Sequence, residues 1–231
     1  MTKLNTGRKK QWLDEDVFEA AKSRVSYIFD HFNHFYVSFS GGKDSGVLLN
    51  LAIEEGERRG RLPIDVLIVD FEAQYIETER FIKRMVKSNK IRPYWVCLPI
   101  SLRNSVSQFE PKWLCWDPES KHRWIRELPN SMGVISSEQA WPFFYTGMEF
   151  EDFVFEFASW YQQCKAEKIA VLIGLRADES LNRFNTVRNR KKEKYQSRLW
   201  TTKMQKDVFM AYPIYDWKVS DIWVANGRFS W

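Results

Sequence analysis

The sequence has little cysteine, little histidine and no long apolar run. Its three cysteines, Cys97, Cys115 and Cys164, form no CxxC pair and have no metal-type spacing with the three histidines, which argues against a zinc site. An odd and sparse set of cysteines indicates reduced thiols. The longest apolar stretches, such as residues 169–175, are far shorter than the roughly 18 residues of a membrane span, and the charged first sixteen residues lack a signal-peptide core. We therefore expect a cytoplasmic protein without membrane contact.

The composition is that of a globular chain. Hydrophobic residues make up 44% of the 231 residues and charged residues 28%, which excludes the disordered and collagen-like classes. A chain of this length can bury a core without disulfides. Neither an internal repeat nor a clear linker divides the sequence, so we expect one domain over residues 1–231.

Positive charge is concentrated in one segment, which runs from Arg183 to Arg198. It holds seven basic residues and one acidic residue, or +6, and leaves 28 basic and 29 acidic residues, or −1, in the rest of the chain. Such a local patch favours a specific anionic partner. A mobile lid over a small anion, a nucleic-acid surface and a solvated helix face all fit this pattern.

Apolar runs and helical patterns alternate along the chain. Strands are expected at residues 35–39, 64–69, 94–98, 169–175 and 208–214, with helical spacing between them and after residue 219. This alternation predicts an α/β fold, namely a Rossmann-like five-stranded, mostly parallel sheet with helices on both faces. Residues 101–145 lack periodicity and are expected to form an irregular insertion over the carboxyl edge. The tryptophans in this insertion are expected to fill a small core or to contact a partner chain, and stacking on nucleic acid is the alternative.

The strongest chemical signal is the string SGGKDSG at residues 40–46, directly between the first expected strand and the next helix. Two glycines allow a tight turn, and successive amides at a helix N-terminus bind anions. Lys43 adds a cation, and Ser40 and Ser45 add hydroxyl donors. The string is not a Walker A loop, because that motif needs a glycine where Val37 stands. It predicts a phosphate-binding loop, and a plain capped turn is the alternative.

Polar residues follow the second and fourth expected strands, at the edge where ligands of open α/β sheets bind. Asp70 and Glu72 could orient Mg²⁺ or contact the nucleotide, or else Asp70 could satisfy loop amides while Glu72 is solvated. Arg176 suits a phosphate or sulfate, and a surface pair with Glu179 is its alternative. Each cysteine is expected to be a buried small hydrophobe without a catalytic role.

The loop resembles the PP-loop motif of the adenine nucleotide α-hydrolase-like superfamily, and three further stretches resemble motifs of one branch of it. The further stretches are VDFE at 69–72, GLRADES at 174–180 with Arg183, and YPIYDW at 212–217 with DIW at 221–223. Together they resemble the phosphoadenosine phosphosulfate (PAPS) reductase branch, and most closely its uncharacterised sulfurtransferase-like members. The resemblance implies ATP or PAPS with Mg²⁺ as ligands, a role in sulfur metabolism, and a possible ParB-like protein partner.

The resemblance also implies a set of site residues. Nucleotide contacts are expected from Ser40, Gly41, Gly42, Lys43, Asp44, Ser45, Asp70, Phe71, Gly174, Arg176, Glu179 and Arg183. Lys43 and Arg176 are the expected catalytic residues, and Asp70 is the expected metal ligand. The cysteine-containing tail of the PAPS reductases has no counterpart here, and since relatives usually continue beyond this point, a C-terminal part could be missing.

These features together predict an enzyme that cleaves ATP between the α and β phosphates and transfers the adenylyl group to an oxyanion or another acceptor. The intact loop resembles that of ATP-splitting relatives more than that of the reductases. Two alternatives stay open. The first is a PAPS-binding enzyme that transfers a sulfuryl or sulfur group, and the second is a non-catalytic nucleotide-binding or nucleic-acid-associated module.

Overall fold

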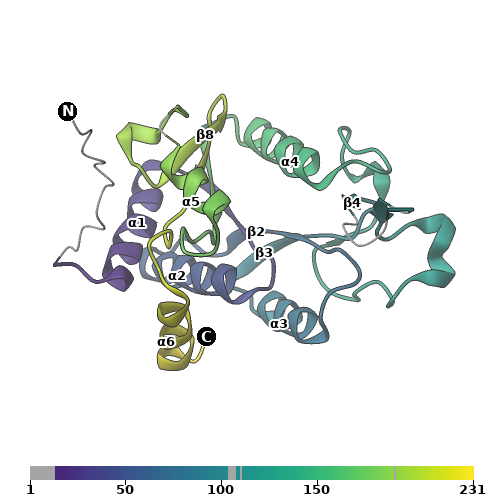
Figure 1. Ribbon diagram of the computed structural model, residues 1–231, viewed down its shortest axis with the longest axis horizontal. Coiled ribbons are helices and arrows are strands. Elements are labelled where there is room, and N and C mark those ends of the chain that lie inside the picture. Colours follow the sequence, from purple (N-terminus) through teal and green to yellow (C-terminus); the bar gives the residue numbers. More distant parts are fainter. Residues whose placement is uncertain (1–13, 104–107, 110, 190) are drawn as a thin grey trace, which may run out of the picture.

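The computed structural model describes residues 14–231 except 104–107, 110 and 190, and its centre is a seven-stranded sheet with the order β6-β3-β2-β1-β7-β9-β8 (Figure 1). The strands are β1 (His34–Ser38), β2 (Ile64–Val69), β3 (Ile91–Val96), β6 (Val134–Ile135), β7 (Ile169–Ile173), β8 (Thr201–Gln205) and β9 (Val208–Ala211). All neighbours pair in parallel except β8 and β9. The α/β class with a mostly parallel sheet is therefore confirmed.

Helices cover both faces of the sheet because its central strands are apolar on both sides. The helices are α1 (Val17–His31), α2 (Lys43–Arg59), α3 (Ile76–Lys87), α4 (Phe150–Lys165), α5 (Leu181–Arg188) and α6 (Val219–Phe229). Figure 1 shows α2 and α3 on one face and α4 on the other. Right-handed crossovers explain why α2 and α3, which connect consecutive strands, share a face.

The expected number of five strands was too low, because β6 and β8 each add a strand at one edge of the sheet. The β8 sequence TTKMQ has no apolar run, because its two buried residues are threonines whose hydroxyls are hydrogen-bonded. Strand β6 has two residues and follows Gly133. An added Cβ on that glycine would lie 2.4 Å from the carbonyl oxygen of Pro93 on β3, so only glycine permits this close pairing.

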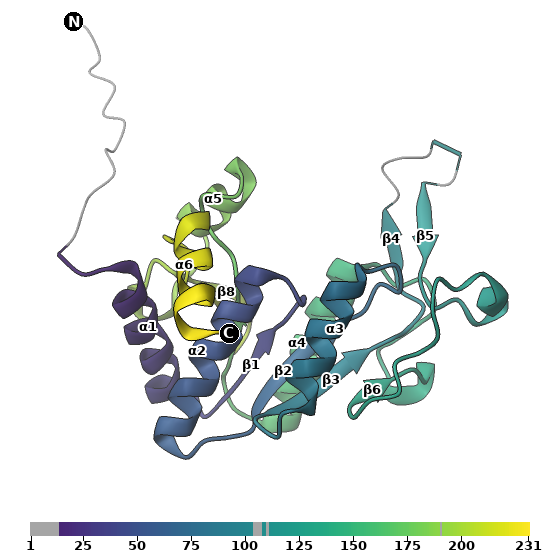
Figure 2. The same cartoon turned by 90° about the horizontal axis from the view of Figure 1, so that it is seen from below.

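The expected insertion contains short elements rather than irregular chain alone. They are the hairpin strands β4 (Ser101–Arg103) and β5 (Lys112–Leu114), the 3₁₀ helices η1 (Pro118–Arg123) and η2 (Glu138–Ala140), and strand β6. Residues 104–107 and 110 of this segment lie outside the described residues. Figure 2 shows the hairpin extending away from the sheet beyond α3. Trp116 and Trp141 are buried in the main hydrophobic core, whereas a separate small core was predicted for the tryptophans of this segment.

No helix among the described residues is both long and apolar enough to cross a membrane.

The last 3₁₀ helix, η3 (Tyr195–Ser197), lies in the basic segment, between α5 and β8.

Candidate functional site

The predicted phosphate loop lies at the carboxyl end of β1 and leads directly into α2, which begins at Lys43 with Gly42 as its N-cap. Gly41 has a φ of +74°, a conformation that favours glycine. A Cβ at this position would also lie 2.7 Å from Thr78 Cγ2 and 2.8 Å from Ile82 Cγ1, so the loop packs tightly on α3. Glycine is therefore required here both by the backbone and by the packing.

Two serine hydroxyls close the loop. The Ser40 amide donates to Ser45 Oγ (3.2 Å), Ser45 Oγ donates to the Gly42 carbonyl (3.1 Å), and the two hydroxyls lie 3.0 Å apart. The first α2 backbone bond runs from the Gly46 amide to the Gly42 carbonyl (2.9 Å), so the amides of Lys43 and Asp44 have no intrahelical acceptor. Free amides at a helix N-terminus form an anion-binding arrangement.

The charges at the loop are organised around Asp44. Its carboxylate accepts from Lys43 Nζ (2.9 Å) and from Arg176 Nε (2.5 Å). The Arg176 side chain is only 4% exposed, whereas that of Lys43 is 36% exposed. Asp44 therefore holds a buried arginine at the loop and leaves Lys43 accessible to a ligand. The sequence suggested Glu179 as the partner of Arg176 and did not indicate the contact with Asp44.

Gly174 brings the end of β7 against the loop. A Cβ at this position would lie 2.8 Å from both the backbone nitrogen and the Cα of Ser45. Because β7 pairs with β1 in parallel, both strands end at the same edge of the sheet. Arg176, which lies two residues after Gly174, consequently reaches the loop.

Glu179 and Arg183 lie beside this cluster. The Glu179 carboxylate is 4.0 Å from Arg176 Nη2, 3.4 Å from the Arg176 amide and 3.4 Å from Arg183 Nε. Ser180 caps α5 by accepting from the Arg183 amide (3.2 Å). The structure thus brings Lys43, Asp44 and Arg176 into one cluster and places Arg183 at its exposed margin.

The second predicted polar pair, Asp70 and Glu72, is buried and anchors the insertion. Asp70 is 1% exposed, and its carboxylate accepts from Arg126 Nη2 (2.5 Å), Trp95 Nε1 (2.8 Å) and the Glu72 amide (2.9 Å). The expectation that Glu72 could be solvated was wrong, because it is 3% exposed. Its carboxylate accepts from two backbone amides of the insertion.

Asp70 does not fit a magnesium site in this arrangement, because both of its carboxylate oxygens already accept hydrogen bonds. Among the described residues, no group of three or more histidine, cysteine, aspartate or glutamate residues is placed to hold a metal ion. Phe71 is half-buried and packs edge-on against Phe150 at 5.2 Å. The nucleotide contacts of Asp70 and Phe71 stay predictions, whereas the expected metal role of Asp70 does not agree with these hydrogen bonds.

Two of the three cysteines, Cys97 and Cys115, are buried as predicted. Burial raises the pKa of Cys97 well above its usual range and raises that of Cys115 to about 12. The expectation that Cys164 is also buried was wrong, since this thiol is exposed near the end of α4. It lies in the last turn of the helix, where one face is open to solvent.

The basic segment is only partly a free surface. Lys194 donates to the Val187 carbonyl (3.3 Å) and to Thr202 Oγ1 (3.2 Å), and burial, assisted by the charge of Lys192, lowers its pKa. Arg198 lies over the Tyr27 ring at 4.6 Å. Arg190 lies outside the described residues. These contacts hold the second half of the segment to the body, and the lid interpretation stays a prediction.

A curated relative is 39% identical over 213 residues, which cover 90% of this chain and 51% of the relative. It is the uncharacterized protein YbdN of Escherichia coli (strain K12). The chain thus spans about half the length of this relative.

Similar solved structures include U34-tRNA thiolase NcsA from Methanococcus maripaludis, with 11% identity over 93% of this chain and 63% of the other, and a TM-score of 0.49. Candida glabrata FMN adenylyltransferase in complex with ATP has 15% identity over 94% and 58%, with a TM-score of 0.46. Candida auris PAPS reductase has 12% identity over 96% and 89%, with a TM-score of 0.44. Identities and TM-scores this low support no statement about the function of this chain.

The family comparison agrees with the motifs and with the position of the loop in the sheet. The model of the phosphoadenosine phosphosulfate reductase domain matches residues 34–225, which extend from β1 into α6. This match covers most of the chain. The protein therefore belongs to the phosphoadenosine phosphosulfate reductase domain family.

Proposed function

We propose that the chain binds ATP with its phosphates in the loop from Ser40 to Ser45 and transfers the adenylyl group to an acceptor oxyanion. The observation that carries this proposal is the convergence of free α2 amides, the accessible Lys43 and the buried Arg176 at one carboxyl edge. Phosphoryl-type transfer depends on positioning and on charge stabilisation more than on covalent protein chemistry. An arrangement of fixed donors and cations suits that demand.

In this proposal an acceptor oxygen attacks the α-phosphorus, and the bond from that phosphorus to the bridging α–β oxygen breaks. Pyrophosphate leaves with the electron pair of that bond, and Lys43 neutralises part of the charge that develops on it. Asp44 orients Lys43 and holds Arg176 in place. A bound Mg²⁺ would supply further charge neutralisation at the phosphates. The roles proposed for Lys43, Asp44 and Arg176 do not depend on this ion.

A second candidate is a PAPS-binding enzyme that transfers a sulfuryl or sulfur group, and membership of the family favours it. The same loop and cations suit the phosphates of PAPS. Thiol-dependent reduction does not suit Cys97 and Cys115, because both are buried and their thiol pKa values are raised, and Cys164 is the exposed thiol. A ParB-like partner, and nucleic acid at the exposed side chains of the basic segment, stay predictions.

The experiment that tests the proposal follows ATP, Mg²⁺ and sulfate by ³¹P nuclear magnetic resonance in the presence of the protein. Adenylyl transfer predicts inorganic pyrophosphate as a product. Formation of ADP and orthophosphate would contradict the proposal, because the β–γ bond would then be the one that breaks. Calorimetry with adenosine 3′,5′-bisphosphate tests the second candidate, which predicts tighter binding of this compound than of ATP.

A further inference from the structure

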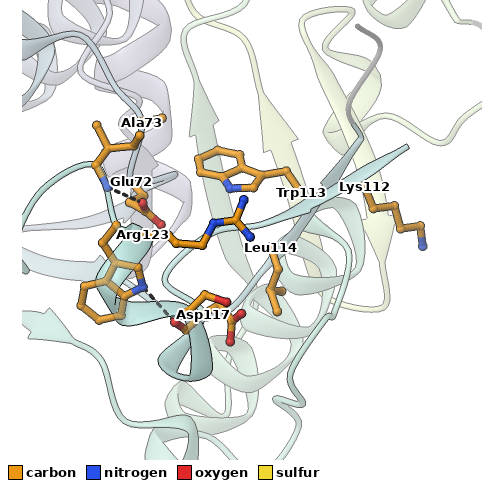
Figure 3. Close-up of a pocket in the computed structure, with 10 residues that line it drawn as sticks. Glu72, Ala73, Lys112, Trp113, Leu114, Asp117 and Arg123 are labelled. Atoms are coloured by element: carbon orange, nitrogen blue, oxygen red, sulfur yellow. Dashed lines mark hydrogen bonds between the residues drawn. The ribbon is translucent and has the colours of Figure 1, made fainter. Parts of the chain in front are cut away.

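A cleft of about 550 Å³ opens between the hairpin strand β5 and the 3₁₀ helix η1, next to the turn that follows β2 (Figure 3). Its volume lies within the usual range of small-molecule sites, about 300–1,000 Å³. The side chains that line it include Glu72, Leu114, Trp113, Trp124, Asp117 and Arg123. Glu72, which the sequence suggested as a possible nucleotide contact, lines this cleft, whereas the residues of the loop from Ser40 to Ser45 do not.

Two indole rings give the cleft flat apolar walls. Trp124 is fixed, because its Nε1 donates to the Asp117 carbonyl (2.9 Å) and its ring meets the buried Trp116 edge-on at 5.2 Å. Trp113 stands on β5, opposite Leu102 of β4. Rigid aromatic side chains bind planar ligands at a low cost in conformational entropy. The walls therefore suit a planar ring.

Arg123 is the cation that remains available in the cleft, and Asp117, whose carboxylate accepts from the Glu119 amide (3.1 Å), is an acid that also lines it. The exposed Arg123 side chain forms no ion pair or hydrogen bond within the described part of the chain, and Figure 3 shows it extending toward Trp113 and Leu114. The other cation, Lys112, pairs with Glu149 at 2.9 Å. Both oxygens of Glu72 already accept backbone amides. A free guanidinium beside an aromatic wall favours a ligand with a carboxylate or another oxyanion.

Glu72 connects this cleft to the edge of the sheet that carries the nucleotide loop. It follows β2, and β2 pairs in parallel with β1, whose carboxyl end leads into the loop. The same Glu72 carboxylate accepts from the amides of Trp116 (2.8 Å) and Ile125 (2.8 Å), which lie on either side of η1. The cleft is therefore held at the same edge as the loop.

We propose that this cleft binds the acceptor, a small planar acid whose oxyanion pairs with Arg123 and whose ring packs against Trp113. The identification as acceptor rests on the proposed adenylyl transfer, whereas the binding of a planar acid does not. One oxygen of that oxyanion would attack the α-phosphorus while pyrophosphate leaves. The product would be a mixed anhydride of the acid with adenylate.

The test is calorimetric titration of the protein with 2-naphthoate and, separately, with 2-naphthalenemethanol, which has the same rings without the charge. Wild-type protein should bind the acid about tenfold more tightly than the alcohol, as one charge-assisted hydrogen bond implies. Arg123→Gln should remove that preference, and Trp113→Leu should weaken both compounds. Arg80→Gln, at an exposed α3 arginine outside the cleft, is the matched control and should change nothing.

Equal binding of the acid by wild type and Arg123→Gln would overturn the proposal. It would also be overturned if a single-stranded oligonucleotide bound through Trp113 and Arg123 while 2-naphthoate did not, because the cleft would then be a nucleic-acid site. Lys43→Ala separates the two proposals. If this variant loses ATP but keeps 2-naphthoate, both stand, and if ATP never binds while 2-naphthoate does, only the acceptor role fails.

Discussion

Replacing Gly174 with alanine tests whether the end of β7 must lie against the nucleotide loop. The added Cβ would lie 2.8 Å from the Ser45 Cα and nitrogen and 3.0 Å from the Asp44 carbonyl carbon. Ordinary carbon contacts lie near 3.5–4.0 Å, so backbone must move by about half an ångström or more. Overpacking of this kind costs about 1–3 kcal/mol, and each kcal/mol lowers the Tm of a chain of this size by about 2–4 °C.

The displaced backbone is the loop itself, so Gly174→Ala should also weaken ATP binding, by about tenfold or more. Thermal unfolding and calorimetry measure the two effects. Gly227→Ala is the control, because this glycine is exposed within α6 and an added Cβ meets no atom within 4 Å. It should raise stability by about 0.5–1 kcal/mol and leave ATP binding unchanged. A Gly174→Ala protein with wild-type Tm and affinity would refute the packing argument.

Thiol titration with an aromatic disulfide reagent should label only Cys164 rapidly in the folded protein and all three cysteines in denaturant, because Cys97 and Cys115 are buried. Rapid labelling of a second thiol would contradict this assignment. Glu55→Gln should destabilise the protein by about 2 kcal/mol at pH 7, since hydrogen bonds from Arg58 and Arg59 outweigh burial and lower the Glu55 pKa to about 2. Because a lowered carboxyl pKa stabilises the fold above about pH 4.5, the difference from wild type should shrink as pH falls from there toward 2. If the destabilisation caused by Glu55→Gln grew as the pH fell, it would contradict a lowered Glu55 pKa.

The main strands could be predicted because their signal is local. β2 and β7 are short β-branched runs buried on both faces, and such runs are visible in the sequence. The edge strand β8 carries no such signal, because its buried residues Thr201 and Thr202 are polar and its pairing with β9 depends on the rest of the sheet. Edge strands are therefore the part of this fold that tertiary structure decides.

The candidate site also has one part that could be predicted from the sequence and one part that could not. The loop residues are contiguous, so their spacing alone predicted an anion-binding turn. The partners of the buried charges are distant in the sequence, since Asp44 and Arg176 are 132 positions apart and Asp70 and Arg126 are 56 positions apart. Arg126 belongs to the segment that matched no motif, and nothing in its local sequence distinguishes it from other arginines. Such pairings follow from the folded arrangement, which sequence spacing does not encode.

The central claim, that the loop from Ser40 to Ser45 binds nucleotide phosphates, is tested most directly by calorimetric titration of ATP into Lys43→Ala and Lys90→Ala proteins. Both lysines are partly exposed and lie within 2.9 Å of a carboxylate, but Lys90 pairs with Glu57 and lies just before β3, away from the carboxyl edge. The account predicts that Lys43→Ala weakens ATP binding by about tenfold or more, since a charge-assisted contact is lost, and that Lys90→Ala binds as wild type does. Equal ATP affinity in both variants and wild type, with both variants folded, would contradict it.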